Sequence, residues 1–217
     1  MSRARNILAA NRERNRDERL IGDPFISMNF LAGAATCTVN GTNTDFDDIC
    51  IEDLDWGTKI VGSFGAEGLD SCQGVLPAAL AAELGTDLSM VAQFSITDLP
   101  TASLVLEVHD DPGYNVANYA SIAAGGDLEL FFNNTGATST PGLEEAQMYT
   151  LAVTFTPGQI QACIGGGSVS RLIVPPLSAS INQVAWFWEN VSLQRLELFK
   201  LPFSELQLRR ISTHIIS

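Results

Sequence analysis

The sequence predicts an all-β protein: an antiparallel β-sandwich with an N-terminal helical arm and a short C-terminal helix. Three observations support this prediction. Apolar residues recur at every second position in several segments, which is the period of a strand with one buried face. Turn-forming Gly, Pro, Asn and Asp separate these segments about every ten residues. Long helical patterns are almost lacking, as is typical of a sandwich.

The clearest strand pair lies within Tyr149–Val169. The apolar positions of its first strand are Tyr149, Leu151, Val153 and Phe155. Pro157 and Gly158 then favour a chain reversal, because Pro presets φ for one turn residue and Gly accepts the positive φ of the next. Alternation resumes from Ile160 to Ile164. This dipeptide suits a type II turn, which fits a two-residue hairpin poorly, so a longer loop stays open.

Four further segments predict strands. They are Ile26 to Phe30, Leu88 to Thr97, Leu104 to Val108 and Asp127 to Asn133. Pro77 to Leu84 predicts one short internal helix, which Gly85 ends.

The final helix has the best-defined start in the sequence. Ser204 and Gln207 have the spacing of a capping box, and Phe203 and Leu208 have that of a hydrophobic staple. We therefore expect a helix to begin at Ser204.

Three stretches resemble parts of laminin-G-like domains in the concanavalin A-like superfamily. Tyr149–Val169 resembles their central hairpin, and Val191–Ser212 resembles their closing strand and helix. The stretch SMNFLAG, Ser27–Gly33, resembles the first strand of such domains in bacteriophage virion proteins. The resemblance frames most of residues 25–213. It implies a jelly-roll sandwich of a virion structural protein, and none of the three stretches is a catalytic signature.

Length and charge divide the chain into an arm, residues 1–24, and one laminin-G-like domain, residues 25–217. The first twenty residues hold six Arg against three acidic residues, a net +3, so with −13 overall the remainder carries −16. We expect the arm to anchor on other virion proteins or on a neighbouring copy in a homo-oligomer; a solvated terminus is the alternative. The candidate anchoring residues are Arg3, Arg5, Arg12, Arg14, Arg16 and Arg19.

The same charge distribution makes nucleic acid an unlikely partner, since phosphate contacts need a positive surface. Apolar runs are too short to span a membrane, the longest lying at about Val75–Ala82. The N-terminus lacks the apolar region of a secretory signal, so we expect assembly into a virion in the host cytoplasm. Buried free thiols are the favoured state of Cys37, Cys50, Cys72 and Cys163, with a Cys37–Cys50 disulfide left open.

Two groups of residues are candidate ligand sites. Calcium could be held by Asp45, Asp47, Asp48, Asp53 and Asp55, although their spacing does not match an EF-hand and a solvated loop is the alternative. The candidate glycan-binding aromatics are Trp56, Tyr114, Tyr119, Trp186 and Trp188. The last two share one strand face and are alternatively core residues.

No catalytic residue is predicted. His109 lacks a nucleophile motif, and the acidic segment Glu52–Asp55 departs from the pattern of glucanases in the superfamily. We therefore expect a non-enzymatic virion protein, such as a head decoration, spike or tail-associated adhesion subunit. The alternative is a carbohydrate-binding lectin domain, calcium-dependent if the acidic loop binds metal, that attaches to host surface glycans. A glycosidase is a third hypothesis.

Overall fold

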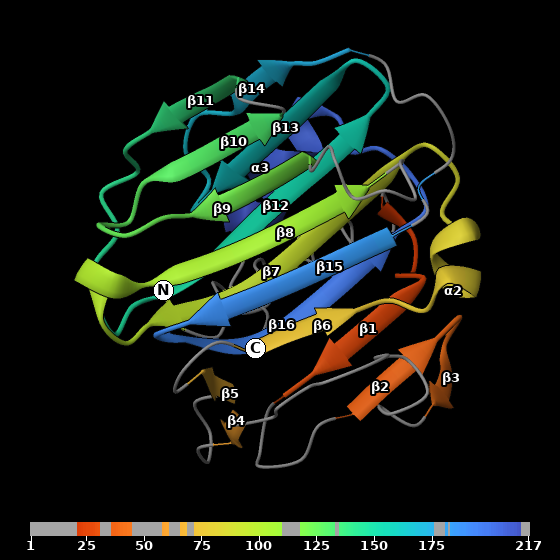
Figure 1. Ribbon diagram of the computed structural model, residues 1–217, viewed down its shortest axis with the longest axis horizontal. Coiled ribbons are helices and arrows are strands. Elements are labelled where there is room, and N and C mark those ends of the chain that lie inside the picture. The colour runs from red at the N-terminus through yellow and green to blue at the C-terminus, as the bar shows by residue number, and fades with distance from the viewer. Residues whose placement is uncertain are drawn as a thin grey trace, which may run out of the picture.

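The computed structural model of this chain is a β-sandwich of two antiparallel sheets (Figure 1). It describes residues 21–30, 36–44, 58–60, 66–68, 72–109, 118–132, 135–175, 181 and 183–213. The predicted all-β sandwich is confirmed in these residues. The helical arm lies outside them up to residue 20, and so do its six Arg residues.

Sheet A contains ten of the described strands. Its main path runs β14 (Ser170–Ile173), β13 (Gln159–Ile164), β12 (Met148–Thr156), β7 (Leu88–Ile96), β16 (Val191–Phe199), β1 (Ile26–Asn29), β2 (Thr36–Val39) and β3 (Thr42–Thr44). Two short strands, β4 (Thr58–Ile60) and β5 (Ala66–Gly68), join it through β16.

Sheet B contains six of the described strands and lies in front of sheet A in Figure 1. Its order is β11 (Thr135–Ser139), β10 (Leu128–Phe132), β9 (Asn118–Ile122), β8 (Ser103–His109), β15 (Gln183–Glu189) and β6 (Cys72–Val75). The described helices are α2 (Ala78–Ala82), the 3-10 helix η4 (Leu99–Thr101) and α3 (Glu205–Thr213).

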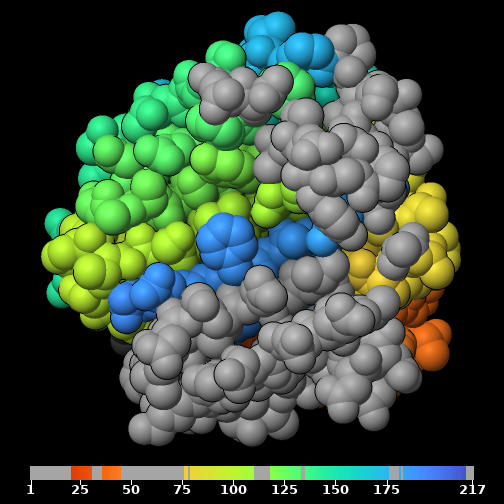
Figure 2. Space-filling model, in the orientation of Figure 1, coloured from red at the N-terminus to blue at the C-terminus, as the bar shows by residue number. Residues whose placement is uncertain are grey.

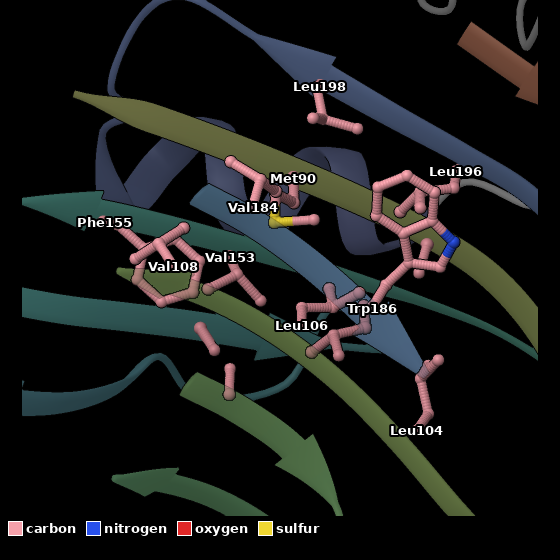
Figure 3. Close-up of a cluster of buried hydrophobic side chains, with 14 of the residues drawn as sticks. Met90, Leu104, Leu106, Val108, Val153, Phe155, Val184, Trp186, Leu196 and Leu198 are labelled. Carbon is pink, nitrogen blue, oxygen red and sulfur yellow. The ribbon is translucent and has the colours of Figure 1, made fainter. Parts of the chain in front are cut away.

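The core lies between the sheets, where the alternating apolar residues of both meet. Figure 3 shows part of it, with Trp186 of β15 beside Met90 of β7 and Leu196 of β16. Each fully buried side chain of this size contributes about 1.5–3 kcal/mol relative to leaving it in water. On one side the sheet edges also meet, because the hydroxyls of Ser139 in β11 and Ser170 in β14 lie 2.8 Å apart.

The predicted hairpin is confirmed, and its loop has two residues. Thr156 of β12 pairs with Gln159 of β13, so only Pro157 and Gly158 lie between the strands. Gly158 has φ +95°, the value that the second central residue of a type II turn requires. The open possibility of a longer loop is therefore not realised.

The central strands of sheet A are buried on both faces, whereas their alternation predicts one buried face. Helix α3 packs across the outer face, on β12 and β13. It covers a second apolar cluster made by Val91, Ala152, Cys163, Phe199, Phe203, Leu208 and Ile211. Ile21 belongs to the predicted arm, and its side chain is half-buried against this cluster.

Polar side chains under this cover are hydrogen-bonded. The hydroxyls of Ser89 and Thr154 lie 2.8 Å apart, and the backbone N–H of Phe203 donates to both at 3.1 Å. Ser89 Oγ also donates to the carbonyl of Leu201 at 2.7 Å. These bonds fix the segment that leads into α3, since a buried polar group without a partner would cost about 1–3 kcal/mol.

The predicted start of α3 is confirmed. The hydroxyl of Ser204 accepts a bond from the backbone N–H of Gln207 at 3.3 Å, and Gln207 Oε1 accepts one from the backbone N–H of Ser204 at 2.9 Å. This reciprocal pair is the capping box. The staple residues Phe203 and Leu208 both belong to the second cluster.

Candidate functional site

The outer face of sheet B lacks the helix that covers the outer face of sheet A in the described part of the chain. Figure 2 views this face, with β8, β9 and β10 in green shades and β15 in blue. Alternation places Leu104, Leu106 and Val108 of β8 in the core and the residues between them on the outer face. The same alternation in β9, β10 and β15 gives the face its composition.

Strand register arranges these outer residues in rows across the four strands. One row contains Phe187, Val105, Ser121 and Glu129. The next row contains Ala185, Glu107, Tyr119 and Phe131. Aromatic rings, carboxylates and a hydroxyl therefore share one surface, although they are distant in sequence.

A hollow of about 430 Å³ lies on this surface. Its strand residues include Val105, Glu107, Tyr119, Ser121, Glu129 and Phe187. The segments 101–103 and 123–124 complete the lining. Among these lining residues none is Lys or Arg. Hollows that bind small molecules measure about 300–1,000 Å³ and combine apolar walls with a few polar groups, so this one has suitable size and chemistry.

The Tyr119 ring is held by stacking on Phe131 of the neighbouring strand. The two ring centroids lie 4.9 Å apart, with 15° between the ring planes. Phe131 lies opposite Gly136 of β11, where an added Cβ would come within 3.4 Å of the Phe131 ring. The stack with Phe131 gives the hollow an aromatic edge at Tyr119.

Two carboxylates lie near the Tyr119 phenol. Burial raises the pKa of this phenol above its ordinary value of 10.0, and the negative charges of Glu129 and Glu107 raise that pKa further. Glu107 lies directly opposite Tyr119 on β8, and one of its oxygens, Oε1, is 2.8 Å from Nε2 of His109. This contact with His109 holds one oxygen of the Glu107 carboxylate.

Of the three sequence-predicted glycan aromatics that the structure describes, Tyr119 alone reaches this surface. Tyr119 lines the hollow. Trp56 and Tyr114 lie outside the described residues. Trp186 and Trp188 are 0% exposed and point into the core, so neither can contact a ligand, which corrects that prediction. Between them, Phe187 occupies the outer face, because successive residues of a strand point to opposite sides.

Sequence reasoning missed Glu107, Glu129, Phe131 and Phe187 as site residues. A signal was present, since in SLVLEVH and LELFF the residues between the apolar core positions must face outward. Alternation alone does not say that four such strands lie side by side. That adjacency comes from strand order.

The predicted calcium ligands Asp45, Asp47, Asp48, Asp53 and Asp55 lie outside the described residues. Within the described part, no group of three or more His, Cys, Asp or Glu could hold a metal ion. None of the described helices is long and apolar enough to cross a membrane.

The two cysteines with described side chains, Cys37 and Cys163, are buried free thiols. Burial raises the pKa of Cys37 from 9.0 to about 11. Burial also raises the pKa of Cys163, against the opposing effects of the Ser212 hydroxyl and of Arg209. Cys50, the partner of Cys37 in the disulfide left open by the sequence, lies outside the described residues.

Comparisons with known proteins identify a shared fold and no family. Neither a protein-family model nor a curated protein matches the sequence. A solved structure of Trypanosoma rangeli sialidase matches with a TM-score of 0.60 and 12% identity, over 97% of this chain and 40% of that chain. Its complex with a difluorinated KDN matches with a TM-score of 0.60 and 13% identity, over 89% of this chain and 34% of that one.

A third structure, the CBM40 of Ruminococcus gnavus IT-sialidase bound to α2,3-sialyllactose, has a TM-score of 0.47 at 12% identity, over 60% of this chain and 84% of that chain. A TM-score below 0.5 is too low to carry an argument. The chain therefore shares a β-sandwich fold with a part of the trypanosomal sialidase, and it spans well under half of that protein's length.

Proposed function

We propose that this protein binds carbohydrate in the hollow on the outer face of sheet B, as a non-enzymatic module. The observation that carries the proposal is the Tyr119–Phe131 stack beside Glu107 and Glu129 in a hollow of about 430 Å³. A sugar ring has an apolar C–H face and a rim of hydroxyls. Aromatic rings pack against the first, and carboxylates accept hydrogen bonds from the second.

The shared fold supports this proposal in a general way. Trypanosoma rangeli sialidase, part of whose chain has this fold, has been solved in complex with sialic acid. At 14% identity this likeness concerns the fold, so the choice of sugar must come from the residues of this chain.

The proposal is tested by a glycan array followed by calorimetry with the full chain. Tyr119→Ala and Phe187→Ala should each weaken the best glycan at least tenfold. Leu206→Ala is the matched control, because it removes an apolar side chain that is 59% exposed on α3, behind the other sheet. If no glycan binds, or if the control weakens binding as much as the other two variants, the proposal is wrong.

The array, repeated with chelator, also tests whether glycan binding requires calcium. A signal that disappears with chelator and returns with Ca²⁺ would support a metal at Asp45–Asp55. A signal unchanged by chelator would show that sugar binding does not require the metal.

The virion role remains a prediction from sequence. It rests on the charge reversal between residues 1–20 and the rest of the chain and on the resemblance of Ser27–Gly33. The sialidase structures named above lend it no support. Deletion of residues 1–20 should abolish incorporation into particles and leave glycan affinity unchanged.

A further inference from the structure

We propose that the hollow selects sugars by charge, discriminating against carboxylated sugars and binding hexosamines with a free amine more tightly than their N-acetylated forms. This inference deepens the proposed carbohydrate binding and rests on it. It departs from the sialic acid of the structures that share the fold.

The first argument is the sign of the charge around the hollow. Its lining contains the carboxylates of Glu107 and Glu129 and, among the described residues, no Lys or Arg. Lys59 is the only Lys or Arg in the sequence between Ile21 and Ser170. Proteins bind a carboxylate most strongly through the paired N–H groups of Arg, so an anionic sugar would meet repulsion here and would lack this partner among the described lining residues.

The second argument is the position of the carboxylates. Glu129 and Glu107 both lie near the Tyr119 phenol, and the negative charge of each raises the pKa of that phenol. The Glu107 side chain is only 18% exposed, so water and salt screen its charge less than that of a surface residue. The contact with His109 uses Oε1 of Glu107, one of the two oxygens of that carboxylate.

The third argument is the aromatic edge beside these charges. An ammonium group is attracted both to the negative face of an aromatic ring and to a carboxylate. A hexosamine offers an apolar ring face for Phe187 and Tyr119 and a cation for Glu107 and Glu129. N-acetylation removes that cation and leaves the ring unchanged.

Calorimetry with matched sugars tests the proposal. We expect tri-glucosamine to bind about tenfold more tightly than tri-N-acetylglucosamine at low salt, because a hydrogen bond to a charged donor is about twice as strong as a neutral one. The ratio should shrink in 0.5 M NaCl. Lactose should bind at least tenfold more tightly than 3′-sialyllactose.

Two variants locate the effect. Glu107→Gln and Glu129→Gln keep the shape and hydrogen-bonding ability of the side chain but remove its charge. Each should reduce the glucosamine-to-N-acetylglucosamine affinity ratio about five- to tenfold and narrow the gap between lactose and sialyllactose. Glu205→Gln, on the opposite side of the molecule, should leave both ratios unchanged and controls for net charge.

The outcomes separate this inference from the proposed function. If no sugar of any charge binds, both fail, and if only carboxylated sugars bind, only the charge selection is overturned. If N-acetylglucosamine or lactose binds in a Tyr119-dependent way but amine and acetyl forms bind equally, or sialyllactose binds more tightly, only the charge selection is overturned. Equal binding by a tri-lysine peptide would also overturn it, because the site would then recognise charge without a sugar ring.

Discussion

Trp186 and Phe187 are neighbours on β15 with opposite environments, and exchanging each for Ala separates stability from binding. Trp186 is fully buried between the sheets, whereas Phe187 lines the hollow. Removing a buried Trp costs about 3–5 kcal/mol through lost burial and the cavity left behind. For a chain of this size that loss lowers Tm by about 10 °C.

Phe187 is partly exposed, so Phe187→Ala should cost about 1 kcal/mol of stability. Its loss should instead fall on glycan binding, which we expect to weaken at least tenfold. Trp186→Ala should bind the same glycan with unchanged affinity per folded molecule. Urea unfolding followed by circular dichroism gives the stability, and calorimetry gives the affinity.

Trp186→Phe refines the comparison. It keeps an aromatic ring in the core and deletes the indole N–H, which has no hydrogen-bond partner among the described residues. We expect a loss of about 1–2 kcal/mol, well below that of the Ala variant. The reasoning is refuted if Trp186→Ala weakens binding beyond its unfolded fraction, or if Phe187→Ala destabilises the protein as much as Trp186→Ala.

Three further predictions concern α3 and the buried thiol. Ser204→Ala should lower stability by about 1 kcal/mol in urea unfolding, and combining it with Gln207→Ala should cost less than the sum if the two caps act together. Gly166→Ala should cost about 2–3 kcal/mol of stability, because φ of Gly166 is +72° and a Cβ there would lie 2.8 Å from the methyl carbon of Thr213 in α3. Gly165→Ala should cost about 1 kcal/mol, because Gly165 has φ +57° but open space around its Cβ position. Equal losses of stability in the two variants would contradict this account. Burial raises the pKa of Cys37 to about 11, so the folded state holds this proton more tightly than the unfolded state. The free energy of unfolding should therefore fall between pH 9 and 11 by up to about 1.4 kcal/mol per pH unit. Urea unfolding at a series of pH values measures this dependence, and Cys37→Ala should make it less steep.

Alternation did not predict β9, which carries Tyr119. Local patterns in the sequence were sufficient for the hairpin of β12 and β13, for β1, β7, β8 and β10, for the short helix before Gly85 and for the start of α3. Each depends on neighbours within a few residues: side-chain alternation, the φ freedom of Gly, or a capping pair. Ser204 and Gln207 are bonded as their spacing predicts.

The environment of each strand face depended on distant segments. Thr150 and Thr154 read as the exposed side of β12, yet both are buried, because α3 and the segment before it cover that face. The pattern of β15 is less clear than that of β8, since the face opposite Trp186 and Trp188 carries Phe187 between its polar ends Gln183 and Glu189. Only the packing of sheet A against β15 assigns the Trp side to the core.

The sequence by itself determined an all-β chain, its turns, its helix cap and the opposite charges of its two parts. The tertiary structure alone decided that Glu107, Tyr119, Glu129 and Phe187 share one hollow. These residues come from β8, β9, β10 and β15, and β15 reaches its place between β8 and β6 only when the distant strands pair. Alternation along one strand determines which residues share a face of that strand. Only the order and hydrogen-bonded register of the strands determine which residues of different strands become neighbours.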